Sequence, residues 1–526
     1  MNPLSSQALF DQVSQSIRFL LPELTLVGSA CVLFLLAAFR SSRRFSGSLA
    51  FGAILAAAGV AFFVGEPAFL ASDRFVASID PSGVAPFIRW VALGAGALYV
   101  LLGFSDSNRQ TAPEYFGCLL VVIGGLSLVA RANDLLSLFL ALEMISIPTY
   151  VLLYLPTQSK PAQEAALKYF MLSILSSGVL LFGFSYLYGL TGALNLPLIA
   201  ETLSDASKVG PVSPLALIAA VMVIAGLGFR LAAVPFHFYA PDVYEGAPSG
   251  VVAQLAFIPK VAGLVALARI FGLLTPDAPF DAARTLIPLT LWVIAAVSMT
   301  FGNLLALIQD NLKRLFAYSG IAHAGYMLIG FLVATAAPQA TGSPTQSGFD
   351  SVLVYLVAYG LMTVGIFCVL GYLTHSGRTI ETIDDLAGLG RTNPLAAGLL
   401  CLFFLSLIGM PLTAGFNGKL LLFFGAFETS TSTPLENLYR VLTLIAVVNS
   451  AIAAVYYLKA LSVMFLRSPL QPAAPAKGYA AFLAALACAV GTLGFGVYPK
   501  PLVDAAREAA PIPIATTPAG SAAATR

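Results

Sequence analysis

The feature that most constrains this chain is a succession of apolar runs, each long enough to cross a lipid bilayer as a helix. A membrane-spanning helix needs about 20 mostly apolar residues, and 58% of these 526 residues are hydrophobic. Fourteen such runs lie near residues 17–39, 48–70, 87–104, 115–131, 134–155, 164–188, 213–236, 248–274, 286–307, 313–335, 350–374, 395–427, 438–466 and 478–499. The sequence therefore predicts an all-α polytopic membrane protein with about 14 transmembrane helices.

The charged and cysteine residues exclude several other classes of protein. Only 10% of the residues are charged, whereas soluble domains carry about a quarter, and a net charge of +2 gives no basic surface for nucleic acid. There is no C-x-x-C motif, and five widely spaced cysteines lie in apolar runs: Cys31, Cys118, Cys368, Cys401 and Cys488. We therefore expect free thiols, with no metal, iron–sulfur cluster or other cofactor bound by this chain.

The basic residues of the short loops predict the orientation, because cytoplasmic loops are enriched in Lys and Arg. Loops after even-numbered runs and nearby helix ends hold six, namely Arg74, Arg89, Arg131, Lys208, Arg284 and Arg440. Loops after odd-numbered runs hold eleven, namely Arg40, Arg43, Arg44, Arg109, Lys160, Lys313, Arg314, Arg378, Arg391, Arg467 and Lys477. The odd-numbered loops are therefore predicted to be cytoplasmic, and both termini to lie on the outer, periplasmic side.

A few ionisable residues lie inside the apolar runs, where each charge costs about 2.5–3.5 kcal/mol at a helix centre. Such residues are retained for function by default. The candidates are Glu143, Lys168, Arg230, Lys260, His323 and Lys419. Two of them have simpler explanations. Lys168 could extend to the nearby membrane interface, and His323 could simply form a hydrogen bond between helices. Arg269 and Lys459 lie closer to the ends of their runs, so we expect their side chains to extend to the membrane interface.

Two runs are interrupted by helix-breaking residues. Pro235 lies at the end of the seventh run and Pro241 just after it, while the twelfth contains Gly409, Pro411 and further glycines. Broken helices at membrane depth line polar cavities and mark coupling sites in transporters built from inverted repeats. Because the interruptions are five runs apart, an odd number, a second five-helix unit would enter the membrane inverted. Coincidence among many spans is the alternative.

This spacing predicts five parts of the chain. They are an N-terminal three-helix segment (1–114), a first five-helix repeat (115–274), a second, inverted five-helix repeat (286–466), a final transmembrane helix (478–499) and a disordered tail (500–526).

Six motifs in this order resemble subunit N of bacterial proton-pumping NADH–quinone oxidoreductase, the respiratory complex I. They are DLLSLFLALEMISIPTYVLL, EAALKYFMLSILSSGVLLFG, FRLAAVPFHFYAPDVYEGAP, QDNLKRLFAYSGIAHAGYMLIG, IDDLAGLGRTNPLAAG and PLTAGFNGKLLLF. The resemblance covers about residues 115–465. The sibling L and M subunits share this architecture, but APDVYEGAP is similar to the N type, and Lys419 argues against the M type, which usually has glutamate there.

The resemblance implies fourteen helices with two inverted repeats and a polar axis at the membrane midplane. It places the axis at Glu143, Arg230, Lys260 and Lys419, with Lys168 and His323 as neighbours. It also implies a subunit of an NADH:quinone oxidoreductase in the bacterial inner membrane, beside M-type and K-type subunits. FMN, iron–sulfur clusters and quinone would be bound by partner subunits. Arg230 departs from the family pattern, in which a lysine is expected.

We hypothesise that Glu143 and Arg230 form an electrostatic pair and that Lys260 is the first proton-carrying site. A guanidinium keeps its proton in proteins, so Arg230 would act as a fixed positive charge. Lys419 would pass protons towards the outer side or the neighbouring pump subunit, with His323 bridging through water.

Two other functions fit some of these features. A subunit of a multisubunit cation/proton antiporter would share the fold and the buried charges, and the N-type motifs argue against it. A purely structural membrane-arm subunit would not need a lysine at mid-membrane. No nucleotide-binding motif is present, so NADH is not expected to bind this chain.

Overall fold

The computed structural model describes residues 6–38, 45–65, 80, 83–104, 110–155, 159–204, 214–271, 281–336, 348–375, 380–429, 436–470 and 478–510. The regular elements in these ranges are helices, and thirteen are long and apolar enough to cross a membrane. The prediction of an all-helical, multi-pass membrane protein is confirmed. Several basic residues used to predict the orientation lie outside these ranges: Arg40, Arg43, Arg44, Arg74, Arg109, Lys208, Arg378 and Lys477.

The thirteen candidate spans lie in α1 (Ser6–Ala37), α2 (Ser46–Val64), α3 (Val84–Gly103), α4 (Ala112–Arg131), α5 (Leu135–Tyr154), α6 (Lys160–Thr191), α9 (Pro214–Leu231), α11 (Ser249–Phe271), α12 (Asp281–Leu307), α13 (Leu312–Ala336), α14 (Phe349–His375), α18 (Glu436–Leu466) and α19 (Tyr479–Val497). Shorter helices are α7 (Leu196–Ser204), α10 (Ala240–Gly246), η4 (Asp384–Leu386), α15 (Leu389–Thr392), α16 (Pro394–Ile408), α17 (Ala414–Thr429) and α20 (Lys500–Ala509).

Local sequence signals explain where several helices begin and end. At the start of α5, Asp134 accepts a hydrogen bond from the backbone N–H of Ser137, at 2.7 Å. Ser159 caps α6 in the same way, and Gly192 ends that helix with a left-handed backbone at φ 66°. These caps satisfy backbone groups that a helix end leaves unpaired.

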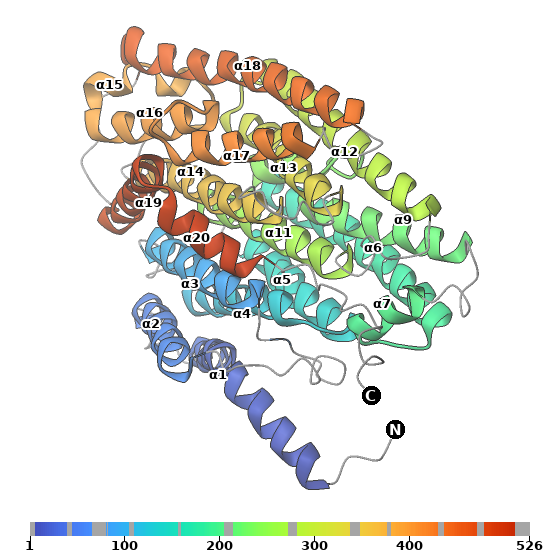
Figure 1. Cartoon of the computed structure of the whole chain (residues 1–526). Coiled ribbons are helices and arrows are strands. Elements are labelled where there is room, and N and C mark those ends of the chain that lie inside the picture. The colour runs from blue at the N-terminus through green and yellow to red at the C-terminus, as the bar shows by residue number, and fades with distance from the viewer. Residues whose placement is uncertain are drawn as a thin grey trace.

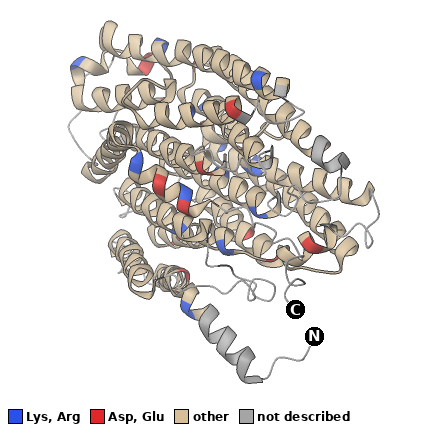
Figure 2. Cartoon of the chain, in the orientation of Figure 1, with Lys and Arg blue, Asp and Glu red and all other residues tan. Residues whose placement is uncertain are grey.

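The helices differ greatly in how much of their surface the bundle covers. In the most apolar stretches of α11 and α13, 94% of the residues are buried, and in α14 89%, but only 28% in α1. Figure 1 shows α11, α13 and α14 in the middle of the bundle, with α1 and α2 at one edge and α18 at the opposite edge. Charged residues are sparse along the ribbons, yet some lie inside this central group (Figure 2). Ionisable side chains on the central helices are therefore surrounded by protein rather than by lipid.

The predicted run 395–427 is not one continuous helix. α16 ends at Ile408 and α17 begins at Ala414, with left-handed backbone between them at Gly409 (φ 99°) and Leu412 (φ 67°). Neither helix reaches 18 residues, so thirteen helices rather than fourteen have a spanning length in the described part of the chain. The other interrupted run also ends early, because α9 stops at Leu231 and the chain is irregular up to α10.

The tail predicted to be disordered from residue 500 begins instead with the helix α20. Leu502, Ala506 and Ala509 are buried along one face of this helix, which packs against α14 and α3. Its three- and four-residue spacing is that of an amphipathic helix. The prediction was wrong here because it was drawn from the Pro- and Ala-rich composition of the end of the chain; residues 511–526 lie outside the described part.

Candidate functional site

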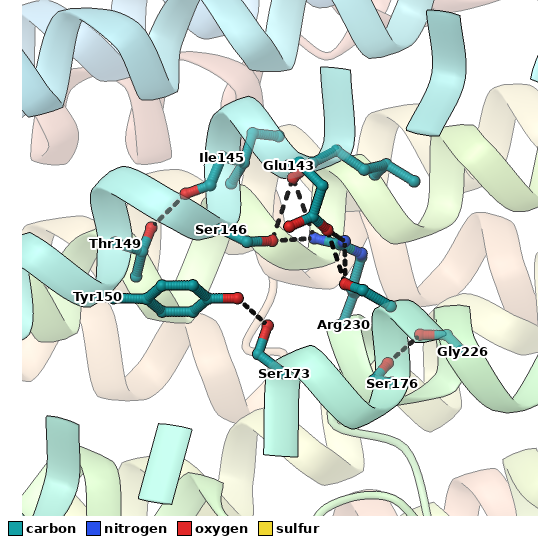
Figure 3. Close-up of polar contacts among 11 residues, drawn as sticks. Glu143, Ile145, Ser146, Thr149, Tyr150, Ser173, Ser176, Gly226 and Arg230 are labelled. Carbon is teal, nitrogen blue, oxygen red and sulfur yellow. Dashed lines mark hydrogen bonds and ion pairs between the residues drawn. The ribbon is translucent and has the colours of Figure 1, made fainter. Parts of the chain in front are cut away.

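Glu143 and Arg230 form a buried ion pair between two neighbouring helices (Figure 3). Glu143 lies midway along α5, and Arg230 lies in the last turn of α9, where the irregular segment begins. The Arg230 Nη2 atom donates to Glu143 Oε1 at 2.9 Å, and the two side chains are 6% and 19% exposed. The structure therefore brings together two of the six candidates.

Hydrogen bonds with two serines stabilise this ion pair. Arg230 Nη1 donates to Ser146 Oγ at 2.6 Å, and Ser177 Oγ donates to Glu143 Oε1 at 2.6 Å. Arg230 Nη1 also donates to the Leu142 carbonyl at 3.2 Å. A buried ion pair needs such additional partners to offset the cost of removing both charges from water.

Lys260 lies near the middle of α11 with only 2% of its surface exposed. Its side chain reaches α13 at Gly320, where Lys260 Nζ would lie 3.4 Å from an added Cβ. Tyr359 Oη, from α14, would lie 3.0 Å from the same Cβ. No described residue forms a hydrogen bond or ion pair with the Lys260 amine. Glycine at position 320 therefore allows a close approach to an amine without an anionic partner.

His323 follows Gly320 by one turn of α13 and lies between the two buried lysines. Its Nδ1 atom is 2.5 Å from the Tyr355 hydroxyl, and its ring centroid is 5.1 Å from that of Tyr359. The ring centroid of His323 is also 5.7 Å from that of Tyr326, which contacts Lys419. The histidine and two tyrosine hydroxyls thus extend polar groups from α11 towards α17.

Lys419 lies on α17 and is bound by oxygen atoms of two other helices. Its Nζ atom donates to the carbonyls of Leu407 (2.8 Å) and Ile408 (3.1 Å), and to Ser450 Oγ on α18 (3.0 Å). The ammonium also lies 5.1 Å from the centroid of the Tyr326 ring. The two carbonyls belong to the last turn of α16, where the interruption leaves them free to accept and where the helix dipole favours a cation.

Lys260, His323 and Lys419 form a buried row, and Lys168 is not part of it. Its side chain is 40% exposed, and its Nζ atom lies 2.7 Å from both Glu164 and Asp242. Arg314 binds the other oxygen of Asp242 at 2.8 Å. Burial acts to raise the pKa of Asp242, but the hydrogen bonds from Lys168 and Arg314 outweigh it and lower that pKa, so the carboxylate stays ionised. Lys168 therefore belongs to an ion-pair cluster joining α6, α10 and α13.

A second buried charge cluster was missed by sequence reasoning. Glu23 on α1 accepts hydrogen bonds from Arg89 at 3.0 Å and from Ser127 at 2.5 Å, and Arg131 Nε lies 3.5 Å away. Glu23, Arg89 and Arg131 are all at most 3% exposed. The available signal was the carboxylate of Pro22-Glu23 inside the first apolar run, while Arg89 and Arg131 had been attributed to helix ends.

Two other basic residues, Arg269 and Lys459, form ion pairs. Arg269 Nη1 lies 3.1 Å from Asp80 Oδ2, and Lys459 Nζ lies 3.3 Å from Asp310 Oδ1 on the surface.

Within the described residues there is no group of three or more His, Cys, Asp or Glu side chains placed to hold a metal ion. All five cysteines are free thiols.

A pocket of about 700 Å³ opens where α11 begins. Ser249, Gly250 and Val251 of α11 line it, together with the ionisable residues Glu245, Lys313 and Glu381. Lys260 lies eleven residues after Ser249 on the same helix, about 16 Å along its axis. The pocket and Lys260 thus lie at different depths along the same helix.

Comparisons with known proteins agree on one family. The family model described as "NADH:quinone oxidoreductase/Mrp antiporter, TM" matches residues 132–452. NADH-quinone oxidoreductase subunit N 1 of Solibacter usitatus is 36% identical over 508 residues, which is 94% of this chain and 97% of that protein. Subunit N of Anaeromyxobacter sp. is 37% identical over 516 residues, covering 94% and 96%.

A solved structure has the same fold. A chain of respiratory complex I from Thermus thermophilus, with bound aureothin, superposes with a TM-score of 0.75 at 29% identity, covering 93% of this chain and all of that one. The resemblance stated from the six motifs is thereby confirmed. The chain belongs to the subunit N family of NADH-quinone oxidoreductase and is a proton-translocating, antiporter-like subunit of the membrane arm of respiratory complex I.

Proposed function

We propose that protons cross this subunit through Lys260, His323 and Lys419, and that the Glu143–Arg230 pair controls the first of these sites. The observation that supports this most is the row itself: two buried lysines lie on α11 and α17, and buried His323 packs against Tyr359 on the Lys260 side and against Tyr326 on the Lys419 side. No carboxylate holds the charge of Lys260 among the described residues. Such an amine is suited to gaining and losing a proton during a cycle.

The ion pair acts on Lys260 through its electrostatic field. Arg230 lies against α11, since its Cβ would be 3.4 Å from a Cβ added at Gly263, one turn from Lys260. If one of these charges moved from about 4 to about 8 Å from another, the interaction would fall from about 4 to about 2 kcal/mol at an effective dielectric of ~20. That change alters proton occupancy by about 30-fold. Water wires and neighbouring subunits supply the remainder.

The pocket at the start of α11 is the entry for protons to Lys260 in this proposal. Its lining includes the ionisable residues Glu245, Lys313 and Glu381, and it is large enough for many water molecules. Lys168 takes its place beside this entry as a charge-coupling residue, joined through Asp242 to Arg314. Lys419 would deliver protons to the outer side or to the neighbouring pump subunit.

The architecture around this path is also part of the proposal. α16 and α17 together make the fourteenth crossing, so residues 115–274 and 286–466 form two inverted five-helix repeats, with the three-helix segment 1–114 and the final helix 478–499 beside them. The interruptions after α9 and between α16 and α17 support this because they lie next to Arg230 and Lys419.

The proposal extends to the setting of the subunit. The termini face the periplasm of a bacterial inner membrane, and M-type and K-type subunits flank this one. FMN, iron–sulfur clusters and quinone are held by other subunits of the complex. The excess of basic residues in the odd-numbered loops supports this orientation.

A conservative substitution at Lys260 tests the path. Lys260→Arg keeps the positive charge but provides a group that does not release its proton. We expect proton pumping by the purified complex in proteoliposomes to fall by about ten-fold or more. The control is Lys459→Arg, the same change in an exposed ion pair with Asp310, which should pump normally. Normal pumping by the Lys260→Arg complex would refute the assignment.

A further inference from the structure

A fully buried asparagine on α12 connects three helices near Lys419. Asn303 Nδ2 donates to the Met299 carbonyl at 2.9 Å and to Asn449 Oδ1 on α18 at 3.3 Å. The same nitrogen lies 3.3 Å from Tyr326 Oη on α13, and Asn303 Oδ1 accepts from Tyr456 Oη on α18 at 3.0 Å. Because the nitrogen faces a backbone carbonyl, which can only accept, the orientation of the amide is fixed.

Two of the four partners of this amide, Tyr326 and Asn449, adjoin the Lys419 site. The Tyr326 ring lies under the Lys419 ammonium, 5.1 Å from its nitrogen. Asn449 directly precedes Ser450, whose hydroxyl accepts from Lys419 at 3.0 Å. Asn449 is in turn held by α12, since its Nδ2 atom donates to Thr300 Oγ1 at 3.3 Å. Asn303 therefore fixes the aromatic group below the ammonium and the α18 backbone beside it.

Simple core packing does not explain an asparagine at this position. Asn303, Asn449, Tyr326 and Tyr456 are each at most 3% exposed, and burying polar groups is costly unless they are all hydrogen-bonded. Apolar residues would join these helices without that risk. The amide orients its neighbours, because its hydrogen bonds set the rotation of the Tyr326 hydroxyl and of α18 about Lys419.

We propose that Asn303 is a positioning residue for proton transfer at Lys419, acting through Tyr326 and through Asn449 with Ser450. This inference rests on the proposed function, in which Lys419 carries protons. Asn303 touches no transferred proton itself. Its loss would let the Tyr326 ring and the Ser450 hydroxyl drift from the ammonium, so that Lys419 would exchange protons less efficiently.

The test is a double-mutant cycle in the whole complex, reconstituted in proteoliposomes. Asn303→Leu removes the amide but keeps the branching at Cγ, and we expect proton pumping per assembled complex to fall about five-fold, as for a lost buried hydrogen bond. Lys419→Met should lower pumping more. The double variant should pump no worse than Lys419→Met alone, because residues that act through one another are not additive.

Two further variants separate positioning from general destabilisation. Trp292→Phe removes another hydrogen bond between α12 and α18, from Trp292 Nε1 to the Leu438 carbonyl at 2.8 Å, far from Lys419, and should pump normally. Tyr456→Phe removes one partner of Asn303 without shortening a core side chain and should cause a smaller loss than Asn303→Leu. It replaces Asn303→Leu in the cycle if that complex does not assemble.

The outcomes distinguish the inference from the proposal beneath it. Normal pumping by Asn303→Leu, or a loss that adds to that of Lys419→Met, overturns the role of Asn303. An equal loss in Trp292→Phe does so too, because any bond between these helices would then have the same effect. Normal pumping by Lys419→Met would instead overturn the proton-carrying role of Lys419.

Discussion

Arg230 stands where the resemblance implies a lysine, and it keeps a positive charge beside Glu143. The resemblance led us to expect a lysine, yet the guanidinium binds Ser146 and the Leu142 carbonyl through Nη1 and Glu143 through Nη2. A single ammonium would not span these groups in the same planar geometry. The position therefore favours a permanent positive charge held in one orientation, which agrees with a role as partner of Glu143 rather than as proton carrier.

Substitutions at Arg230 test this interpretation. Arg230→Lys keeps the charge beside Glu143, so we expect proton pumping to stay within about three-fold of the unmodified complex, the effect of a weaker hydrogen-bond pattern. Arg230→Met leaves Glu143 as an uncompensated buried charge and should reduce pumping far more. The ratio of protons pumped to NADH oxidised in proteoliposomes measures both. If the methionine variant matches the lysine variant, the positive charge is not what matters at this position.

At the scale of elements, the sequence predicted that the helix is interrupted between α16 and α17, but not that Lys419 binds there. Gly409 and Pro411 indicated that the helix could not continue. The sequence did not indicate that Lys419, ten residues after Gly409, folds back onto the last carbonyls of α16. That contact depends on the path of the chain through positive φ at Gly409 and Leu412, which composition does not encode.

Gly409→Ala should disturb this element directly. The backbone at Gly409 has φ 99°, and an added Cβ would lie 3.3 Å from Lys419 Cδ. We expect the complex to lose about 1–2 kcal/mol of local stability and to pump less. Gly398→Ala, inside α16 with nothing within 4 Å of its Cβ, is the matched control and should be neutral or slightly stabilising. Thermal unfolding and proton pumping are measured for both variants. If Gly409→Ala matched Gly398→Ala in both measurements, the backbone at position 409 would not require glycine.

Across the whole molecule, the burial of ionisable residues was easier to predict than the residues they bind. Long apolar flanks located Glu143, Lys260, His323 and Lys419, and all four lie within the bundle, with Glu143 the most exposed. Pairing over long separations was not predictable. Lys168 binds Asp242, 74 residues away, so it joined a surface cluster instead of the buried row. The α1 cluster was missed for the same reason, because Arg89 lies 66 residues from Glu23.

The Glu23 cluster fastens the N-terminal helices to the remainder of the bundle. Glu23→Gln would leave Arg89 and Arg131 without their carboxylate, which typically costs about 3–5 kcal/mol for a buried pair. We expect a lower unfolding temperature and less assembled complex, while the complex that does assemble keeps its ratio of protons to electrons. Glu201→Gln, on the exposed surface of α7, should change neither quantity. A changed ratio with normal assembly would give Glu23 a place in transport itself.

The way Lys419 is bound has a mechanical consequence. Its ammonium belongs to α17, while the oxygen atoms that receive its hydrogens belong to α16 and α18. A small sliding or turning of any one of these three segments would lengthen those bonds and loosen the hold on the charge. If Lys419 carries protons as proposed, such a movement of α16, α17 or α18 would weaken the hydrogen bonds to its ammonium and so make it easier for that nitrogen to release a proton.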